Sequence, residues 1–280
     1  MHALLEPWSH AFMQRALLEL VVIGIVGGVL GWWVVFYELS YSAESLAHAL
    51  FPGLVVAALL GFPLVLGGAL GVLVAAAAVA VFGRTPVIGR DTSVAVVITT
   101  LFGVGVVLAL SPASPPGLDA LLFGDLLGVR TSDLVVAAIV AGLVLGSLAL
   151  LHRLLLAVGF DRSSARAIGA KPLLADLSLL ALLAVAIVIG VQGLGNLLVL
   201  AVIVGPAAIA RMLAQRLSTM MAIASLVAVT CGVGGLYLSY YADTAGGASV
   251  AAVMVGFYVV VRLGAPLTAH RLHRTSVRAS

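Results

Sequence analysis

Glu44 and His48 are the side chains of this sequence whose types and spacing best suit chemistry. They lie one helical turn apart in the run Glu44-Ser-Leu-Ala-His-Ala-Leu-Phe-Pro-Gly53, inside a mostly apolar chain. Residues i and i+4 share a helix face about 6 Å apart, so the carboxylate and the imidazole could bind one divalent cation together. Imidazole nitrogen and carboxylate oxygen suit different divalent metal ions, so the pair alone does not identify the ion.

The composition places this pair in a membrane protein. Apolar residues make up 63% of the 280 residues, charged residues 9%, and the mean hydropathy is +1.25, which excludes a water-soluble domain of this length. A helix needs roughly 20 apolar residues to cross the hydrocarbon layer. The sequence therefore predicts an all-α polytopic membrane protein with about eight or nine transmembrane helices. The nine candidate spans are 16–36, 43–61, 63–82, 92–110, 132–152, 173–192, 196–213, 219–241 and 248–263.

His48 is the only histidine well inside one of these spans. Ionisable side chains inside a membrane are costly, so such a pair marks a functional site by default. A structural histidine, or a Glu–His hydrogen bond that joins two helices, is the alternative. Two protein ligands are too few for a structural zinc site, but a transit site must also release its ion.

Positive side chains divide unequally between the two sides of the membrane. With the 153–172 loop in the cytoplasm, twelve of the fourteen Lys and Arg residues lie inside, and only Arg15 and Arg130 lie outside. Cytoplasmic loops near span ends retain Lys and Arg, so we expect an odd number of spans and a cytoplasmic C-terminus. The basic residues are dispersed without interleaved aromatics, which argues against nucleic-acid binding despite a pI of about 9.4.

The remaining segments complete the domain organisation. Residues 1–15 predict an interfacial segment before a transmembrane domain over 16–264, and residues 265–280 predict a basic cytoplasmic tail. The stretch 118–127 follows a proline-rich break and is too short to span the membrane. We expect it to form a re-entrant or surface helix on the outer side.

The loop 158–172 predicts a short amphipathic helix on the cytoplasmic face. Asp161 near its start and Gly169 at its end are helix-boundary signals, and Pro172 follows. This helix is either a solvated connector or a lever that a soluble motor subunit pushes.

Two pairs of helix-bending residues lie inside predicted spans. Pro52 and Gly53 follow His48, and Gly205 and Pro206 repeat the feature in the seventh span. Proline removes a backbone donor and loosens a helix, so a kink at either place could open a pathway, although ordinary kinked spans explain both equally well. No GxxxxGK[ST] motif occurs, so any ATP must be bound by another subunit.

Several motifs together resemble the membrane permease subunit of the zinc and manganese ABC importer family, and the resemblance runs through most of the chain. They are the Glu44–Gly53 run, Phe160-Asp161 with Ala165, Ala167 and Gly169, Leu121-Leu-Phe-Gly-Asp-Leu-Leu127, the long run from Gly195 through Gly205-Pro206 to Arg211, and Gly235-Leu-Tyr-Leu-Ser-Tyr-Tyr-Ala-Asp243.

This resemblance implies a fold, partners and a location. The fold would be that of a type II, vitamin-B12-importer-like permease in the bacterial plasma (inner) membrane. The permease would work as a homodimer with two cytoplasmic ATPase subunits and an extracytoplasmic protein that delivers Zn²⁺ or Mn²⁺. It would bind no permanent cofactor and would be no enzyme itself. The 158–172 segment would be the coupling helix that meets the ATPase, through Phe160, Asp161, Arg162, Ala165, Arg166 and Gly169.

The family's second span typically contains Asp-Ala-x-Ser-His, with the Asp and His proposed as metal ligands in the pathway. Here Glu44 stands at the Asp position and His48 at the His position, while Ala47 replaces the Ser. Glutamate keeps an oxygen ligand but lengthens it by one methylene. If the second span lines a two-fold axis, both protomers together would supply four ligands.

Other function classes fit parts of the sequence. In a proton-coupled secondary metal carrier, Glu44 and His48 would relay protons without an ATPase, but the sequence shows no convincing internal repeat of the kind such carriers often have. An ABC permease for siderophores or corrinoids would share the fold, but such permeases are generally longer and need a wider pathway. A purely structural membrane scaffold leaves the ionisable pair unexplained.

Overall fold

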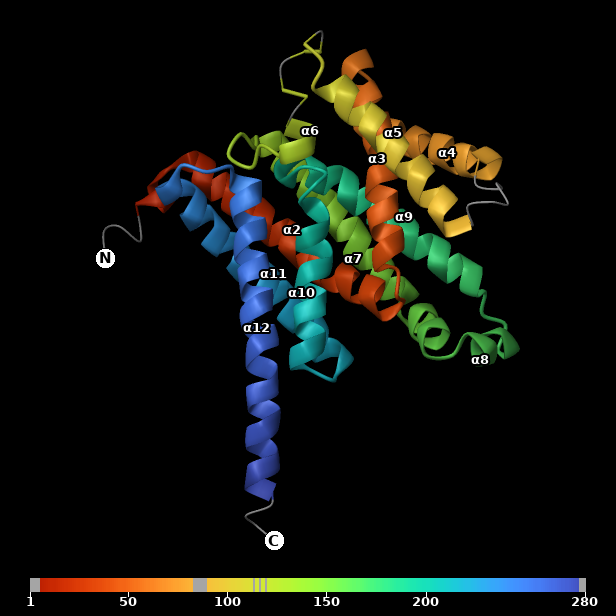
Figure 1. Ribbon diagram of the computed structural model, residues 1–280, viewed down its shortest axis with the longest axis vertical. Helices are drawn as coiled ribbons and strands as arrows, with labels where there is room; N and C mark the ends of the chain where they lie inside the picture. The colour runs from red at the N-terminus through yellow and green to blue at the C-terminus, as the bar shows by residue number, and fades with distance from the viewer. Residues whose placement is uncertain (1–5, 83–89, 113, 116, 119, 277–280) are drawn as a thin grey trace.

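The computed structural model describes residues 6–82, 90–112, 114–115, 117–118 and 120–276, and within these ranges every regular element is a helix (Figure 1). After a 3-10 turn, η1 (Pro7–Ser9), the helices are α2 (Ala11–Phe36), α3 (Ser40–Leu60), α4 (Leu64–Phe82), α5 (Arg90–Ala109), α6 (Ala120–Phe123), α7 (Thr131–Phe160), α8 (Arg162–Ala167), α9 (Pro172–Leu194), α10 (Val199–Leu213), α11 (Leu217–Ala242) and α12 (Gly246–Ser276).

The long helices match the spans expected from hydropathy one for one. In the part of the chain that the structure describes, six helices are long and apolar enough to cross a membrane: α2, α3, α7, α9, α11 and the Gly246–Gly264 part of α12. Three shorter apolar helices, Leu64–Val79, Val94–Ala109 and Val199–Leu213, account for the other predicted spans. The prediction of an all-helical polytopic membrane fold is confirmed.

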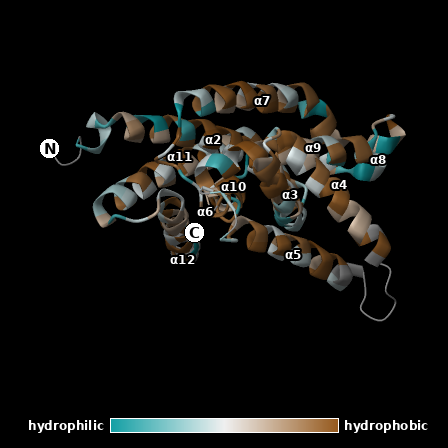
Figure 2. Ribbon diagram, turned by 90° about the horizontal axis from the view of Figure 1, so that it is seen from above, coloured by the Kyte–Doolittle hydropathy of each residue, from teal (hydrophilic) through white to brown (hydrophobic). Residues whose placement is uncertain are grey.

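The helices form two groups, and α9 lies between them in contact with both (Figure 1). Helices α3, α4 and α5 pack on one another, and α2, α10, α11 and α12 form the other group. Helix α9 contacts α3 and α4 as well as α2 and α10, and α7 packs on α2 and α9. Seen from above, α7 lies along one side and α5 and α12 along the other, with hydrophobic residues along most of each span and hydrophilic residues at α8 (Figure 2).

Small residues allow the closest helix contacts. A Cβ atom added at Gly31 of α2 would overlap the backbone carbonyl of Ile203 in α10, and one at Gly53 of α3 would overlap the backbone of α4 at Gly67. Membrane helices gain no hydrophobic stabilisation from meeting each other in lipid, so van der Waals contact between backbones contributes strongly to their association. The glycines at these two positions thus serve close helix packing.

The domain boundaries expected at residues 15 and 264 both fall inside continuous helices, and the division into interfacial segment, transmembrane domain and tail stays a prediction. Helix α2 already begins at Ala11, inside the segment 1–15 expected to lie at the interface. Just before it, the indole N–H of Trp8 donates to the Tyr237 hydroxyl of α11 at 2.6 Å. At the other end, α12 continues past residue 264 to Ser276 without a break. The side chains of the basic tail lie outside the described part of the chain.

The region 118–127 holds a short helix that does not span, α6, as expected. The backbone N–H groups of Asn196 and Leu197, in the loop between α9 and α10, donate to the carbonyls of Leu121 and Leu122 at 2.9 and 3.3 Å. Gly124 and Gly195 both have positive φ, 79° and 78°, and a side chain on either would collide with the other's backbone. The contact between α6 and this loop is therefore made by main chain.

Candidate metal transit site

Helix α3 carries both candidate ligands on one continuous helix. Although Pro52 lies inside it, α3 runs unbroken from Ser40 to Leu60 and ends at Gly61 in the left-handed conformation. One side of α3 is buried against the protein by Ala43, Ala47, Leu50, Phe51 and Leu54. This packing fixes the rotation of the helix and hence the direction in which Glu44 and His48 project.

The opposite side of α3 is left partly uncovered by the protomer. Tyr41 is 60% exposed, Glu44 is exposed, His48 and Pro52 are half-buried, and Val56 is 37% exposed. Their spacing of three or four residues puts them on one face of the helix. Glu44 and His48 therefore lie on a stripe that a second copy, solvent or a passing ion could reach.

The His48 ring is held by an aromatic neighbour on α5. Its centroid lies 4.5 Å from that of Phe102, and Phe102 in turn lies 5.2 Å from Phe51. The imidazole thus packs against a ring of the adjacent helix. This arrangement does not support a Glu–His bond between helices, because both residues belong to α3 and the neighbour is apolar.

Glu44 and His48 do not form a complete metal site with the other described residues of one protomer. No group of three or more His, Cys, Asp or Glu side chains able to hold a metal ion exists among the residues that the structure describes. One carboxylate and one imidazole can bind a divalent cation only in part, because zinc takes four ligands in closed sites. The arrangement can make a brief, partly hydrated contact with an ion, as a transit site needs.

A cavity of about 320 Å³ lies farther along the same side of α3. Its lining is apolar and comes from α3, α4, α5 and the connection between α3 and α4. The lining residues are Pro52, Gly53, Val56, Phe62, Gly67, Leu70, Gly71, Val74 and Leu101. It offers an ion no ligands, so the polar part of this face is confined to the turn around Glu44 and His48.

The residues expected to act as hinges have different surroundings. Gly53 is packed against α4, where an added Cβ would lie 2.7 Å from the Gly71 nitrogen. Pro206 is buried in α10, and a Cβ at Gly205 would meet only the Met254 side chain, at 3.2 Å. Both helices are continuous at these points. The structure gives Gly53 a close-packing role, and gating at either pair remains a prediction.

The expected coupling helix is shorter than the 158–172 segment. Helix α7 continues to Phe160, and α8 spans only Arg162–Ala167. The Asp161 carboxylate accepts hydrogen bonds from the backbone N–H of Ser163 at 2.9 Å and from the hydroxyls of Ser163 and Ser164. These bonds hold the pKa of Asp161 well below its ordinary value. Asp161 is thus the N-cap of α8, and its boundary role agrees with the sequence.

The other residues expected in this segment divide into outward and inward ones. Phe160 is 77% exposed and Arg166 is exposed, whereas Ala165 is buried at 2%. Gly169 has a φ of 81° and ends the segment before α9. Arg162 bonds within the protein, to Asp176 of α9. The structure therefore brings Glu44 and His48 together on one face, and places the α8 residues in a separate cluster.

Comparison with known proteins agrees with this architecture. The family model described as ABC 3 transport family matches residues 9–264. The chain belongs to the ABC 3 transport family. An ABC 3 permease is the membrane subunit, so the expectations of a zinc and manganese importer-type permease and of no enzymatic activity are both confirmed.

Individual relatives of this ABC 3 permease align over nearly its whole length. It is 31% identical to the manganese transport system membrane protein MntC of Listeria monocytogenes, over 92% of each chain. It is 32% identical to the chelated iron transport system membrane protein YfeD of Yersinia pestis, over 91% of this chain and 86% of that one.

Two solved structures share the fold of the ABC 3 permease. PsaBC from Streptococcus pneumoniae, in complex with Fab, superposes with a TM-score of 0.84 at 27% identity, over 90% of this chain and 91% of that one. A metal-chelate type ABC transporter in an inward-facing conformation gives a TM-score of 0.67 at 14% identity, over 90% and 85% of the two chains. The second likeness concerns the fold alone.

The burial of two polar residues of the ABC 3 permease was not predicted from the sequence. Glu19 of α2 is 2% exposed, and its Oε2 atom has no hydrogen-bond partner among the described residues. Asn196 is also 2% exposed, and neither the nitrogen nor the oxygen of its side-chain amide has a hydrogen-bond partner among the described residues. For Glu19, the sequence offered one indication, a lone carboxylate inside the predicted span 16–36. Its position against Gly193 of α9 depends on tertiary packing, which the sequence does not show.

Proposed function

We propose that this permease is the translocation subunit of an ATP-driven importer of divalent transition-metal ions, zinc or manganese, and that each ion contacts Glu44 and His48 as it crosses. The observation that carries the proposal is the juxtaposition of these two ligands on the uncovered face of α3. The manganese and iron transport proteins among the relatives support a metal ion as cargo.

The chemistry of the pair suits transit better than storage. A carboxylate oxygen and an imidazole nitrogen together accept both zinc and manganese. Because the described residues of one protomer add no third ligand, we infer that water or a second copy completes the shell and that the ion is held weakly enough to leave. Phe102 limits the rotation of the imidazole and keeps it beside the pathway.

The transport cycle that we infer needs three kinds of partner. An extracytoplasmic protein delivers the metal ion, a second permease completes the pathway, and two cytoplasmic ATPase subunits drive it. The excess of Lys and Arg around α8 supports a cytoplasmic location for this helix and for the C-terminus. ATP-driven closure of the ATPases moves α8, and the pathway then opens to the bacterial cytoplasm.

Replacement of either ligand is expected to reduce uptake strongly. Changing a residue that supports a metal ligand commonly costs about 10–100-fold in affinity or activity, so Glu44→Gln and His48→Ala should each lower initial uptake by at least ~10-fold. Glu44 is exposed and His48 half-buried, so both variants should insert normally. Uptake is measured in proteoliposomes holding the permease, its ATPase and its binding protein, with ⁵⁴Mn²⁺ or ⁶⁵Zn²⁺.

Asp243→Asn is the matched control, because Asp243 is exposed, has a φ of 51° that asparagine tolerates, and lies on α11's end, away from α3. It should transport like the parent. Normal uptake by both ligand variants would refute the transit site. Uptake that continues without the ATPase and collapses with the proton gradient would refute the ATP-driven mechanism.

Proximity of the α3 faces of two protomers is a separate prediction. In a Cys231→Ala background, Val56→Cys should form a homodimer crosslink with a short thiol reagent, since Val56 lies on the uncovered stripe. Leu143→Cys on α7 is the control, because Leu143 is 64% exposed on another helix. Crosslinking through Leu143 but not Val56 would contradict a two-fold axis at α3.

A further inference from the structure

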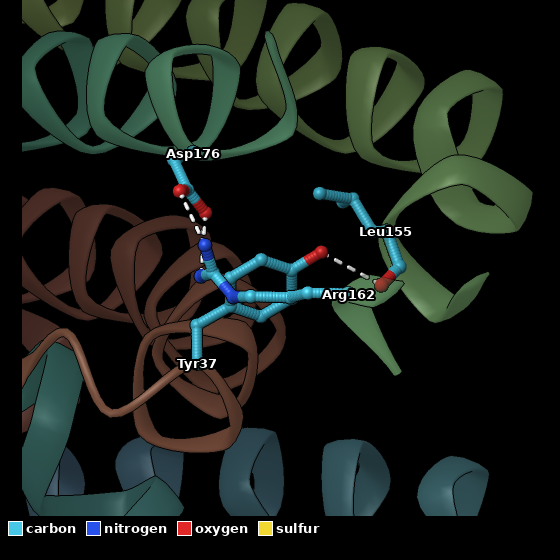
Figure 3. A network of polar contacts seen from close by, with 4 residues as sticks. All are labelled: Tyr37, Leu155, Arg162 and Asp176. Carbon is cyan, nitrogen blue, oxygen red and sulfur yellow. Dashed lines mark hydrogen bonds and ion pairs between the residues drawn. The ribbon is translucent and has the colours of Figure 1, made fainter. Parts of the chain in front are cut away.

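A single arginine connects α8 to two other parts of the protein (Figure 3). The guanidinium of Arg162, the first residue of α8, donates to both carboxylate oxygens of Asp176 in α9, at 2.8 and 2.9 Å. The same guanidinium lies over the ring of Tyr37, with its carbon 5.8 Å from the ring centroid. The hydrogen bonds to Asp176 raise the pKa of Arg162, so it stays charged.

Tyr37 is itself fixed in place. It is 8% exposed, and its hydroxyl donates to the Leu155 carbonyl of α7 at 2.7 Å. Burial, as the largest cause, raises its pKa to about 12, so it keeps the proton that makes this bond. A Cβ at Gly159 of α7 would lie 3.0 Å from the same ring, so α7 and the end of α2 meet closely here.

Tyr37 lies in the connection between α2 and α3, so its contact with Arg162 links α8 to the start of α3. Tyr37 caps α2, and after Glu38, whose φ is 59°, and Leu39 the chain enters α3 at Ser40. The N–H groups of Glu38 and Leu39 donate to the carbonyls of Val35 and Val34 at 3.2 and 2.9 Å. This connection is short and internally bonded, so a displacement of Tyr37 must be passed to the first turns of α3, where Glu44 lies.

We propose that Arg162, Asp176 and Tyr37 form a latch that makes α8 and the start of α3 move as one body, so that the push on α8 reaches the Glu44–His48 turn. The three are positioning residues. The inference rests on the proposed function, in which an ATPase acts on α8. It assigns Arg162 to internal transmission, and leaves Phe160, Arg166 and Ile168 as the outward residues, of which Phe160 and Ile168 are each 77% exposed.

Stability alone does not explain the arrangement. The side chains of Arg162 and Asp176 are 48% and 23% exposed, and ion pairs this open contribute little to folding. The planar guanidinium, in contrast, offers two parallel donors and a flat face at once, which lysine cannot do. The geometry of the contact therefore matters more than its charge.

The first test measures metal ions transported per ATP hydrolysed by the reconstituted importer. Arg162→Ala, Arg162→Lys and Asp176→Asn should keep ATP hydrolysis within about two-fold of the parent and lower the transport ratio at least ~5-fold. Arg166→Ala, a matched arginine on the same helix, should instead weaken binding of the ATPase. An unchanged ratio in the three latch variants overturns the proposal, as does loss of ATPase binding in Arg162→Ala.

A second test does not depend on the cargo. Spin labels are placed at Ala167 of α8 and Tyr41 of α3, both exposed, in a Cys231→Ala background. Their separation should stay constant between the nucleotide-free and ATP-bound complexes, and should change or broaden when Arg162→Ala is added. A separation that already changes in the parent overturns the latch. Failure of the parent to carry any metal would instead refute the proposed function, and the label distances would still decide the latch.

Discussion

Alanine at position 53 is expected to destabilise the permease more than most single substitutions. The new methyl group would overlap the Gly67 carbonyl and lie 2.7 and 2.8 Å from the backbone of Gly71, so α3 and α4 must separate. Overpacking of this kind costs about 1–3 kcal/mol. The midpoint of thermal unfolding in detergent should therefore fall by about 2–10 °C. Size-exclusion chromatography should show a loss of the monodisperse species.

Gly142→Ala is the matched control for this substitution. Gly142 lies inside α7, and a Cβ there would meet nothing within 4 Å. Alanine favours a helix over glycine by about 0.5–1 kcal/mol, so this variant should be neutral or slightly more stable. If Gly53→Ala keeps the parent's midpoint but loses metal uptake, position 53 serves as a hinge and the close-packing explanation is wrong.

Lysine in place of Glu44 is expected to abolish uptake, beyond the loss caused by glutamine. Glutamine only removes an attraction, whereas an ammonium repels the divalent ion. At about 4 Å this repulsion amounts to about 2 kcal/mol in water and about 8 kcal/mol near a protein surface, so even the smaller value slows passage about 30-fold. Because Glu44 is exposed, the substitution should leave folding intact.

The control for the added charge is Leu60→Lys. Leu60 is 72% exposed and ends α3, about 24 Å from Glu44 by helical rise. That distance exceeds the Debye length of about 8–10 Å, and a cation suits a helix C-terminus. Leu60→Lys should transport normally in the same vesicles. Equal inhibition by both lysines would mean that added charge harms the protein generally, and would remove the argument for an ion near Glu44.

The hydropathy pattern predicts the spans of this fold well, because each long helix must be apolar wherever it faces lipid or protein. Gly169 and Asp161 likewise mark the limits of α8, since a left-handed glycine and a side-chain cap are local features of the chain. Helix α2 begins at Ala11, before the predicted span 16–36, and hydropathy does not indicate that start because the first residues of the helix are partly polar. The hydrogen bond from Trp8 to Tyr237 of α11 lies just before it.

Features that depend on contacts between distant segments could not be predicted. The spacing of Glu44 and His48 gives their common face, but which face stays uncovered depends on how α4, α5 and α9 surround α3. The burial of Glu19 and the pairing of Arg162 with Asp176 are of the same kind. Arg162 was expected to contact the ATPase because its sequence neighbours resemble those of a coupling helix. That local pattern does not show that Asp176, fourteen residues later, lies within hydrogen-bond distance of Arg162.

The main-chain contact between α6 and the loop that joins α9 to α10 has a consequence for how the surface of such permeases can vary. Since peptide groups make the hydrogen bonds there, the attachment depends on Gly124 and Gly195 and hardly on the side chains around them. The side chains on the surface around α6 and this loop can then vary in shape and charge without breaking the attachment. If the delivery protein of the proposed importer docks at this end, exchange of surface residues alone would fit the permease to a new one, and the packing of the long helices would not change.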